Sequence, residues 1–158
     1  MTLKKIVSGG QTGVDRGALD AALEAAFPCG GWCPKGRKAE DGIIPQHYPL
    51  SEMPGPSYRA RTRRNVTDSD GTLVLFFGEL TGGTLETLRI AEQLGKPVLT
   101  IDCAAKPAAD AAVEVGAFVR LHEIATLNVA GPRESTHVAG RAYARSLISA
   151  VLRMQLVS

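Results

Sequence analysis

The chain has 158 residues, of which 44% are hydrophobic and 22% charged, with a formal net charge of +2 at pH 7. These values are ordinary for a soluble globular protein, and we expect residues 1–158 to form a single domain. The small net charge argues against nucleic-acid binding, and no apolar run reaches the roughly 20 residues of a membrane helix. No signal-peptide pattern is present at the N-terminus, so cytoplasmic residence is expected.

The chain begins with a short apolar strand, a glycine-rich turn and an amphipathic helix, over residues 4–8, 8–13 and 14–26. In this order, backbone N–H groups gather at a helix N-terminus, where the helix dipole favours an anion. This start indicates an α/β protein that binds a nucleotide or a phosphate. The candidate ligand-binding residues here are Gly9, Gly10, Gln11, Thr12, Gly13, Asp15 and Arg16.

Two common nucleotide motifs fit this turn poorly. Ser8 replaces the first glycine of the dinucleotide fingerprint, and Lys35 and Arg37 stand where an acidic residue should bind the ribose. A P-loop would need a lysine directly after Gly13, where the chain has valine. A turn with a purely structural role remains open, as does a role for Asp15 limited to stabilising the helix dipole.

The next region is less regular. Residues 30–33 form a weak strand, and residues 34–56 are rich in proline and glycine, so little regular structure is expected there. Long loops in compact domains often contact ligands, and we expect this segment to cover part of the ligand. Ser57 should cap a helix that runs through Asn65. Its arginines are expected to form a solvated face or an oligomer contact, with a substrate clamp as the alternative: Arg59, Arg61, Arg63 and Arg64.

A second glycine-rich turn follows the most apolar strand, residues 72–77, and precedes a helix over residues 84–94. The glycines would let the backbone approach a ligand closely, and Thr84 would cap the helix while its N–H groups face a phosphate. A plain strand-to-helix turn is the alternative. The candidate residues here are Gly82, Gly83 and Thr84.

The last part of the chain is predicted to contain strands over residues 97–101 and 126–130 and helices over residues 107–121 and 138–152. A third polar turn follows the second of these strands. Its arginine can bind a phosphate or a carboxylate through two parallel hydrogen bonds, the alternative being a surface salt bridge with the adjacent glutamate. The candidate residues are Asn128, Gly131, Arg133 and Glu134.

Metal and redox chemistry find little support in the sequence. His47, His122 and His137 have no metal-ligand spacing, and three cysteines do not make a disulfide framework. No metal site is therefore expected. No pair of a nucleophile and a base can be recognised either, so catalytic residues are left open.

Apolar strands alternate with helices along most of the chain, which is typical of a parallel sheet covered by helices. We therefore predict a three-layer, Rossmann-like α/β fold with a mainly parallel sheet of about five strands. In such folds ligands bind outside the carboxyl ends of the strands. Because the three polar turns all follow strands, they should meet at that edge of the sheet.

Four motifs resemble those of the molybdenum carrier family: SGGQTGVDRGAL at 8–19, GWCPKGR at 31–37, GGTLET at 82–87 and LNVAGPRES at 127–135. This family is Rossmann-like and is similar to the molybdenum-cofactor carrier and to the LOG (lysine-decarboxylase-like) proteins. The resemblance implies binding of molybdopterin, the molybdenum cofactor or a nucleotide. It also implies self-association as a homodimer or tetramer.

One departure concerns catalysis. The LOG phosphoribohydrolases carry P-G-G-x-G-T-x-x-E, in which the glutamate is implicated in cleaving the N-glycosidic bond. The corresponding stretch here, residues 81–87, has a glycine turn one residue shorter, and Thr87 stands at the position of that glutamate. Glu86 is adjacent, but one step along a helix turns a side chain by about 100°. The resemblance therefore gives weak support to hydrolysis of this type.

The main hypothesis is a non-catalytic protein that binds a small, anionic, nucleotide- or pterin-like ligand, as a molybdenum cofactor carrier would. The alternative is a nucleotide-processing enzyme, a phosphoribohydrolase or an N-glycosyl hydrolase or transferase. It would use Glu86, Asp15 or Glu134 as its carboxylate. A third hypothesis is an assembly module that works through the arginine-bearing helix.

Overall fold

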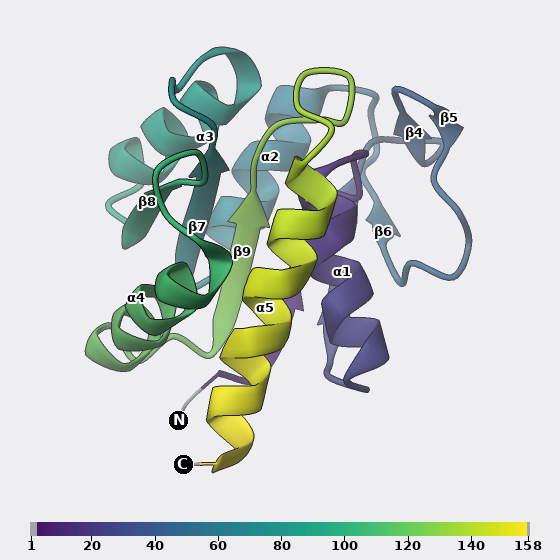
Figure 1. Cartoon of the computed structure of the whole chain (residues 1–158). Helices are drawn as coiled ribbons and strands as arrows, with labels where there is room; N and C mark the ends of the chain where they lie inside the picture. The colour runs from purple at the N-terminus through teal and green to yellow at the C-terminus, as the bar shows by residue number, and fades with distance from the viewer. Residues whose placement is uncertain (1–2, 158) are drawn as a thin grey trace.

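The computed structural model describes residues 3–157. A five-stranded parallel sheet forms its centre (Figure 1). Its strand order is β2–β1–β9–β7–β8, and every adjacent pair is parallel. The predicted α/β fold is thereby confirmed. The strands are β1 (Lys5–Val7), β2 (Cys29–Gly30), β7 (Gly71–Phe76), β8 (Val98–Asp102) and β9 (Thr126–Ala130).

Helices cover both faces of this sheet. The helices α1 (Val14–Glu24), α4 (Ala108–Leu121) and α5 (Gly140–Val157) pack together on one face. The helices α2 (Tyr58–Thr67) and α3 (Gly82–Gln93) pack together on the other (Figure 1). The core between the layers is apolar because the strands contribute fully buried aliphatic side chains, among them Ile6, Leu73, Leu75 and Leu127.

Helix α5 lies directly against α1. Gly17 makes this possible, because a β-carbon at residue 17 would collide with the backbone carbonyl of Arg141 in α5. The first turn of α1 is therefore held between the sheet and α5. This packing fixes the glycine-rich turn that precedes α1.

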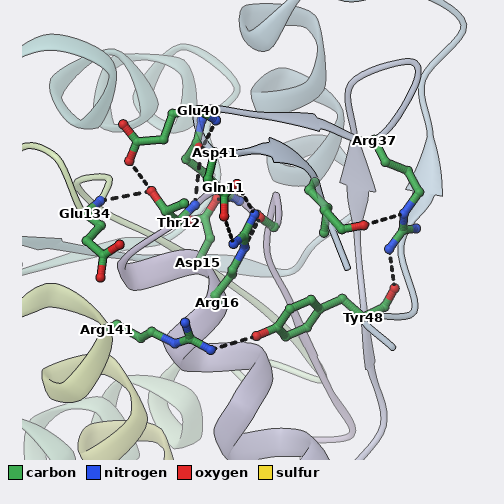
Figure 2. A network of polar contacts seen from close by, with 12 residues as sticks. Gln11, Thr12, Asp15, Arg16, Arg37, Glu40, Asp41, Tyr48, Glu134 and Arg141 are labelled. Atoms are coloured by element: carbon green, nitrogen blue, oxygen red, sulfur yellow. Dashed lines mark hydrogen bonds and ion pairs between the residues drawn. The ribbon is translucent and has the colours of Figure 1, made fainter. Parts of the chain in front are cut away.

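Residues 34–56 contain more regular structure than the sequence predicts. The weak strand predicted over 30–33 is split: its first residue belongs to β2, whereas β3 (Trp32–Cys33) pairs with β6 (Ser51–Glu52) in a separate small sheet. A short hairpin joins β4 (Lys38–Ala39) to β5 (Gly42–Ile43). Buried Arg37 organises the rest by donating hydrogen bonds to the carbonyls of Ile44, Pro45, Tyr48 and Leu50. The bond to Tyr48 is drawn in Figure 2.

The direction of the loops creates a crevice at one edge of the sheet. The chain leaves β9 toward α5 on one face, but it leaves the adjacent strand β7 toward α3 on the opposite face. Loops that diverge in this way open a gap above the carboxyl ends of the two strands, which is the usual ligand site of open α/β sheets. The candidate residues following β7 and β9 lie at this gap.

Candidate functional site

A cleft of about 380 Å³ lies at the carboxyl ends of β7 and β9, within the size range of small-molecule sites. Its walls come from the turn after β1, from α2, and from the segments after β7 and β9. It therefore brings together residues from all three predicted turns. The candidate residues that line it are Gly9, Gln11, Asp15, Gly82, Gly83, Thr84, Asn128, Gly131 and Arg133.

Five candidate residues do not line the cleft and instead shape its surroundings: Gly10, Thr12, Gly13, Arg16 and Glu134. Arg16 is buried, and its Nε donates to the Gly10 carbonyl at 3.0 Å. Its Nη1 and Nη2 bind both oxygens of Asp41 at 2.6 and 2.8 Å (Figure 2). Arg16 thus holds the glycine-rich turn and the β4–β5 hairpin together. Its guanidinium holds the pKa of the Asp41 carboxyl below its usual value.

A second junction lies beside the first. The Thr12 hydroxyl donates to Glu40 and accepts the Glu134 amide at 3.1 Å. The Glu40 carboxylate also accepts from the Ser135 hydroxyl at 2.5 Å. Hydrogen bonds from Ser135 and Thr12 lower the pKa of Glu40. The contacts fasten the tip of the 34–56 segment to the cleft's neighbouring loops, but no residue of that segment is among the lining residues.

Asp15 is a buried carboxyl in the wall of the cleft. Its side chain accepts the Gln11 amide at 3.2 Å, which closes the turn, and the Ser8 hydroxyl donates to its backbone carbonyl at 2.9 Å. Burial raises the pKa of Asp15 from 3.8 to about 6, against the opposing charge of Arg61 and the loop amides. Ionised Asp15 therefore lowers the stability of the folded protein at neutral pH, and the residue lines the cleft.

Arg61 lines the cleft, although the sequence interpretation preferred a solvated or oligomer-contact face for it and did not name it among the candidate site residues. Only 8% of this residue is exposed, and its Nη1 donates to the Gly9 carbonyl at 2.6 Å. Within residues 3–157 no ion pair joins it to a carboxylate. The helical spacing of α2 could have pointed to Arg61, because residues three or four apart share one face of a helix. Tyr58, Thr62 and Asn65 lie on the same face and also line the cleft.

The N-terminus of α3 lies open to the cleft. The helix begins at Gly82 rather than at residue 84, so Thr84 lies in its first turn and the prediction that Thr84 caps the helix was wrong. Thr81 is the N-cap residue and makes no side-chain cap hydrogen bond. Among the residues that the structure describes, the N–H groups of residues 82–84 therefore have neither an intrahelical nor a capping partner. Around the α-carbons of Gly82 and Gly83 a β-carbon would meet nothing within 4 Å.

The residues discussed for hydrolysis separate along this helix. Thr87 lines the cleft and donates its hydroxyl to the Gly83 carbonyl at 3.0 Å. Glu86 is outside the lining set and lies 3.2 Å from Arg59 Nε. The one-residue offset noted in the sequence thus turns the glutamate away from the cleft.

The segment after β9 forms the remaining wall. Asn128 is buried, and its side-chain amide donates to the Thr72 hydroxyl at 3.4 Å. Arg133 is exposed at the mouth of the cleft and forms no ion pair with Glu134 in the described part of the chain. His137 stacks on Phe77 with ring centroids 4.9 Å apart.

Residues 6–152 match the circularly permutated YpsA SLOG family. The chain belongs to this family. It is also similar to a crystal structure from Syntrophus aciditrophicus SB, named as a putative molybdenum carrier protein, with 45% identity and a TM-score of 0.93 over 96% of each chain. The family resemblance predicted from the motifs is confirmed. None of the curated proteins matches the chain.

Residues 3–157 contain no group of three or more His, Cys, Asp and Glu side chains that could hold a metal ion. Over the same range, no helix has the length and apolar character needed to span a membrane.

Proposed function

We propose that this protein binds a phosphate-bearing, nucleotide- or pterin-like molecule in the cleft and acts as a carrier for it, with the molybdenum cofactor as the cargo that the relative's name suggests. The observation that supports this most directly is Arg61. Arg61 acts on Asp15 through its charge, but it forms no direct ion pair with Asp15 or with another carboxylate in residues 3–157. A buried guanidinium without a direct ion pair gains stability when an anion pairs with it. The cleft that it lines leaves room for that anion.

The N-terminus of α3 adds to this argument. Its free N–H groups and the positive end of the helix dipole favour negative charge, and two glycines let a phosphate approach the backbone. We therefore assign the phosphate to the space between Arg61 and residues 82–84. Arg133 at the cleft mouth supplies a second positive charge.

The other lining residues would bind the uncharged part of the ligand. Gln11 and Asn128 offer side-chain amides, whereas Gly9 and Gly131 leave room for Arg61 and Val14 to pack against the backbone of the cleft wall. In this proposal Gly10, Thr12, Gly13, Arg16 and Glu134 maintain the shape of the loops, because their contacts are with the protein itself.

The first experiment is mass spectrometry of small molecules released by acid from freshly purified protein, with molybdenum measured on the same sample. A phosphorylated nucleotide or pterin in near-stoichiometric amount would support the proposal and name the ligand. An empty protein whose melting temperature does not change with nucleoside monophosphates or ribose 5-phosphate would contradict it. Light scattering on the same preparation tests the expected homodimer or tetramer.

Asp15 favours a second candidate function, an N-glycosyl hydrolase or transferase that acts on nucleotides. A carboxyl whose pKa is about 6, in the wall of a cleft, is suited to exchange a proton at neutral pH. Glu86 is a poor choice for this role because it lies outside the cleft. Release of free base from nucleoside monophosphates, retained in Glu86→Gln but lost in Asp15→Asn, would support the enzyme. If no free base is released, the carrier function is favoured over the enzyme.

A further inference from the structure

The cleft has two chemically different walls. The phosphate wall, Arg61 and residues 82–84, comes from α2 and α3 on one face of the sheet. The other wall consists of Phe77, Glu79 and His137, and we call it the ring wall. These residues follow β7 and lie in the loop before α5. A ligand that reaches both walls must carry an anionic group at one end and a different chemical group at the other.

Two aromatic side chains give the ring wall its flat surface. His137 stacks on Phe77 at 4.9 Å with 21° between the ring planes. Tyr143 supports Phe77 from the side at 6.2 Å, edge to face. Phe77 occupies one face of the imidazole, so the half-buried His137 presents its other face and its edge. No hydrogen bond or ion pair engages that imidazole within residues 3–157. The pair is a supported platform for a planar ring.

Glu79 adds a charged group to this platform. It lies two residues after Phe77, in a turn closed by a bridge between these two residues, and it lines the cleft. Its exposed carboxylate forms no ion pair or hydrogen bond with any residue of the described chain. A carboxylate only accepts hydrogen bonds, so its partner on a ligand must be a donor.

We propose that the ring wall selects ligands whose planar heterocycle carries two adjacent N–H donors, as guanine and pterin rings do. The ring stacks on His137, and the Glu79 carboxylate accepts from the ring N–H and the neighbouring amino group. Adenine is disfavoured because it presents a ring acceptor beside its amino group. This inference rests on the proposed function, because the phosphate wall must hold the other end of the same molecule.

The test is calorimetric titration of the full chain with GMP, AMP and ribose 5-phosphate. Stacking and charged hydrogen bonds should make GMP bind at least tenfold more tightly than ribose 5-phosphate. In His137→Ala this advantage should fall about tenfold while the affinity for ribose 5-phosphate stays unchanged. His137→Phe should restore most of it. His122→Ala is the matched control, because His122 also packs against a phenylalanine ring but lies at the end of α4.

Glu79→Gln should reduce the preference for GMP over AMP about tenfold, whereas Glu92→Gln, an exposed change on α3 outside the cleft, should not. Equal affinities for GMP and ribose 5-phosphate, or equal losses for both in His137→Ala, would overturn the inference. Ribose 5-phosphate binding that is lost in Arg61→Met would still support the phosphate wall. Failure of every probe to bind would overturn the proposed function as well.

Discussion

Replacing Asp15 with asparagine should stabilise the protein at pH 8 and change little at pH 4. The perturbation is small in shape, because asparagine keeps an oxygen that can accept the Gln11 amide, which lies 3.2 Å from the Asp15 carboxylate. It removes the charge that burial opposes. Since Asp15 lines the cleft, the charge is retained at the expense of stability, which is common at functional sites.

The magnitude follows from the pKa of Asp15. The unfolded chain releases this proton near pH 3.8, whereas the folded protein retains it to about pH 6. Stability therefore falls as the pH rises between these two values, and the full cost is present above pH 6. Each pKa unit is worth about 1.4 kcal/mol, so the cost is about 3 kcal/mol. At pH 4 the difference between variant and parent should shrink to less than about 1 kcal/mol.

Urea unfolding at pH 4, 6 and 8 measures this difference. Asp110→Asn is the matched control, because Asp110 also lies in the first turn of a helix but is exposed. Its effect should stay within the 0.3–1 kcal/mol or so of a helix-dipole interaction. If Asp15→Asn destabilises the protein at pH 8 but not at pH 4, Arg61 and the loop amides outweigh burial, and the reasoning is refuted.

Three further outcomes follow from the packing. Gly17→Ala should lower the free energy of unfolding by about 1–3 kcal/mol, because the new methyl group forces α1 away from α5; Gly83→Ala, with open space around it, should not destabilise the fold in the same denaturation assay. Ser57→Ala should cost about 1 kcal/mol, because its side chain caps α2. Glu40→Ala should accelerate hydrogen exchange in residues 34–56, since three hydrogen bonds to its carboxylate are lost; unchanged exchange would show that the other contacts suffice.

The sequence predicted the central sheet well because its main strands are apolar runs between turn residues. The strand over 126–130 has the predicted bounds, and the one over 72–77 is shifted by a single residue. The helix predicted to follow Ser57 is also present, and the Ser57 hydroxyl accepts the Ala60 amide at 3.1 Å. Local signals of this kind are sufficient where neighbouring residues alone decide the conformation.

The parts that the sequence did not predict depend on distant partners. Arg16 was predicted as a ligand-binding residue, but its partner Asp41 comes from a hairpin in a segment expected to be irregular. Arg61 was assigned to a solvated or interfacial face, yet it points toward Gly9, 52 residues earlier in the chain. The interpretation of an arginine depends on where its counter-charge lies, and that is a property of the fold.

The position of β9 has a consequence for how the protein is made. This strand is the last in the chain, yet it lies between β1 and β7 in the sheet. Without β9, the pairs β2–β1 and β7–β8 share no strand contact, and β1 and β7 would each leave an open edge able to pair with another chain. Insertion of β9 closes both edges and brings Asn128 and His137 to the cleft in the same step. Completion of the sheet and completion of the cleft therefore depend on the same strand, and truncation before residue 126 should abolish both.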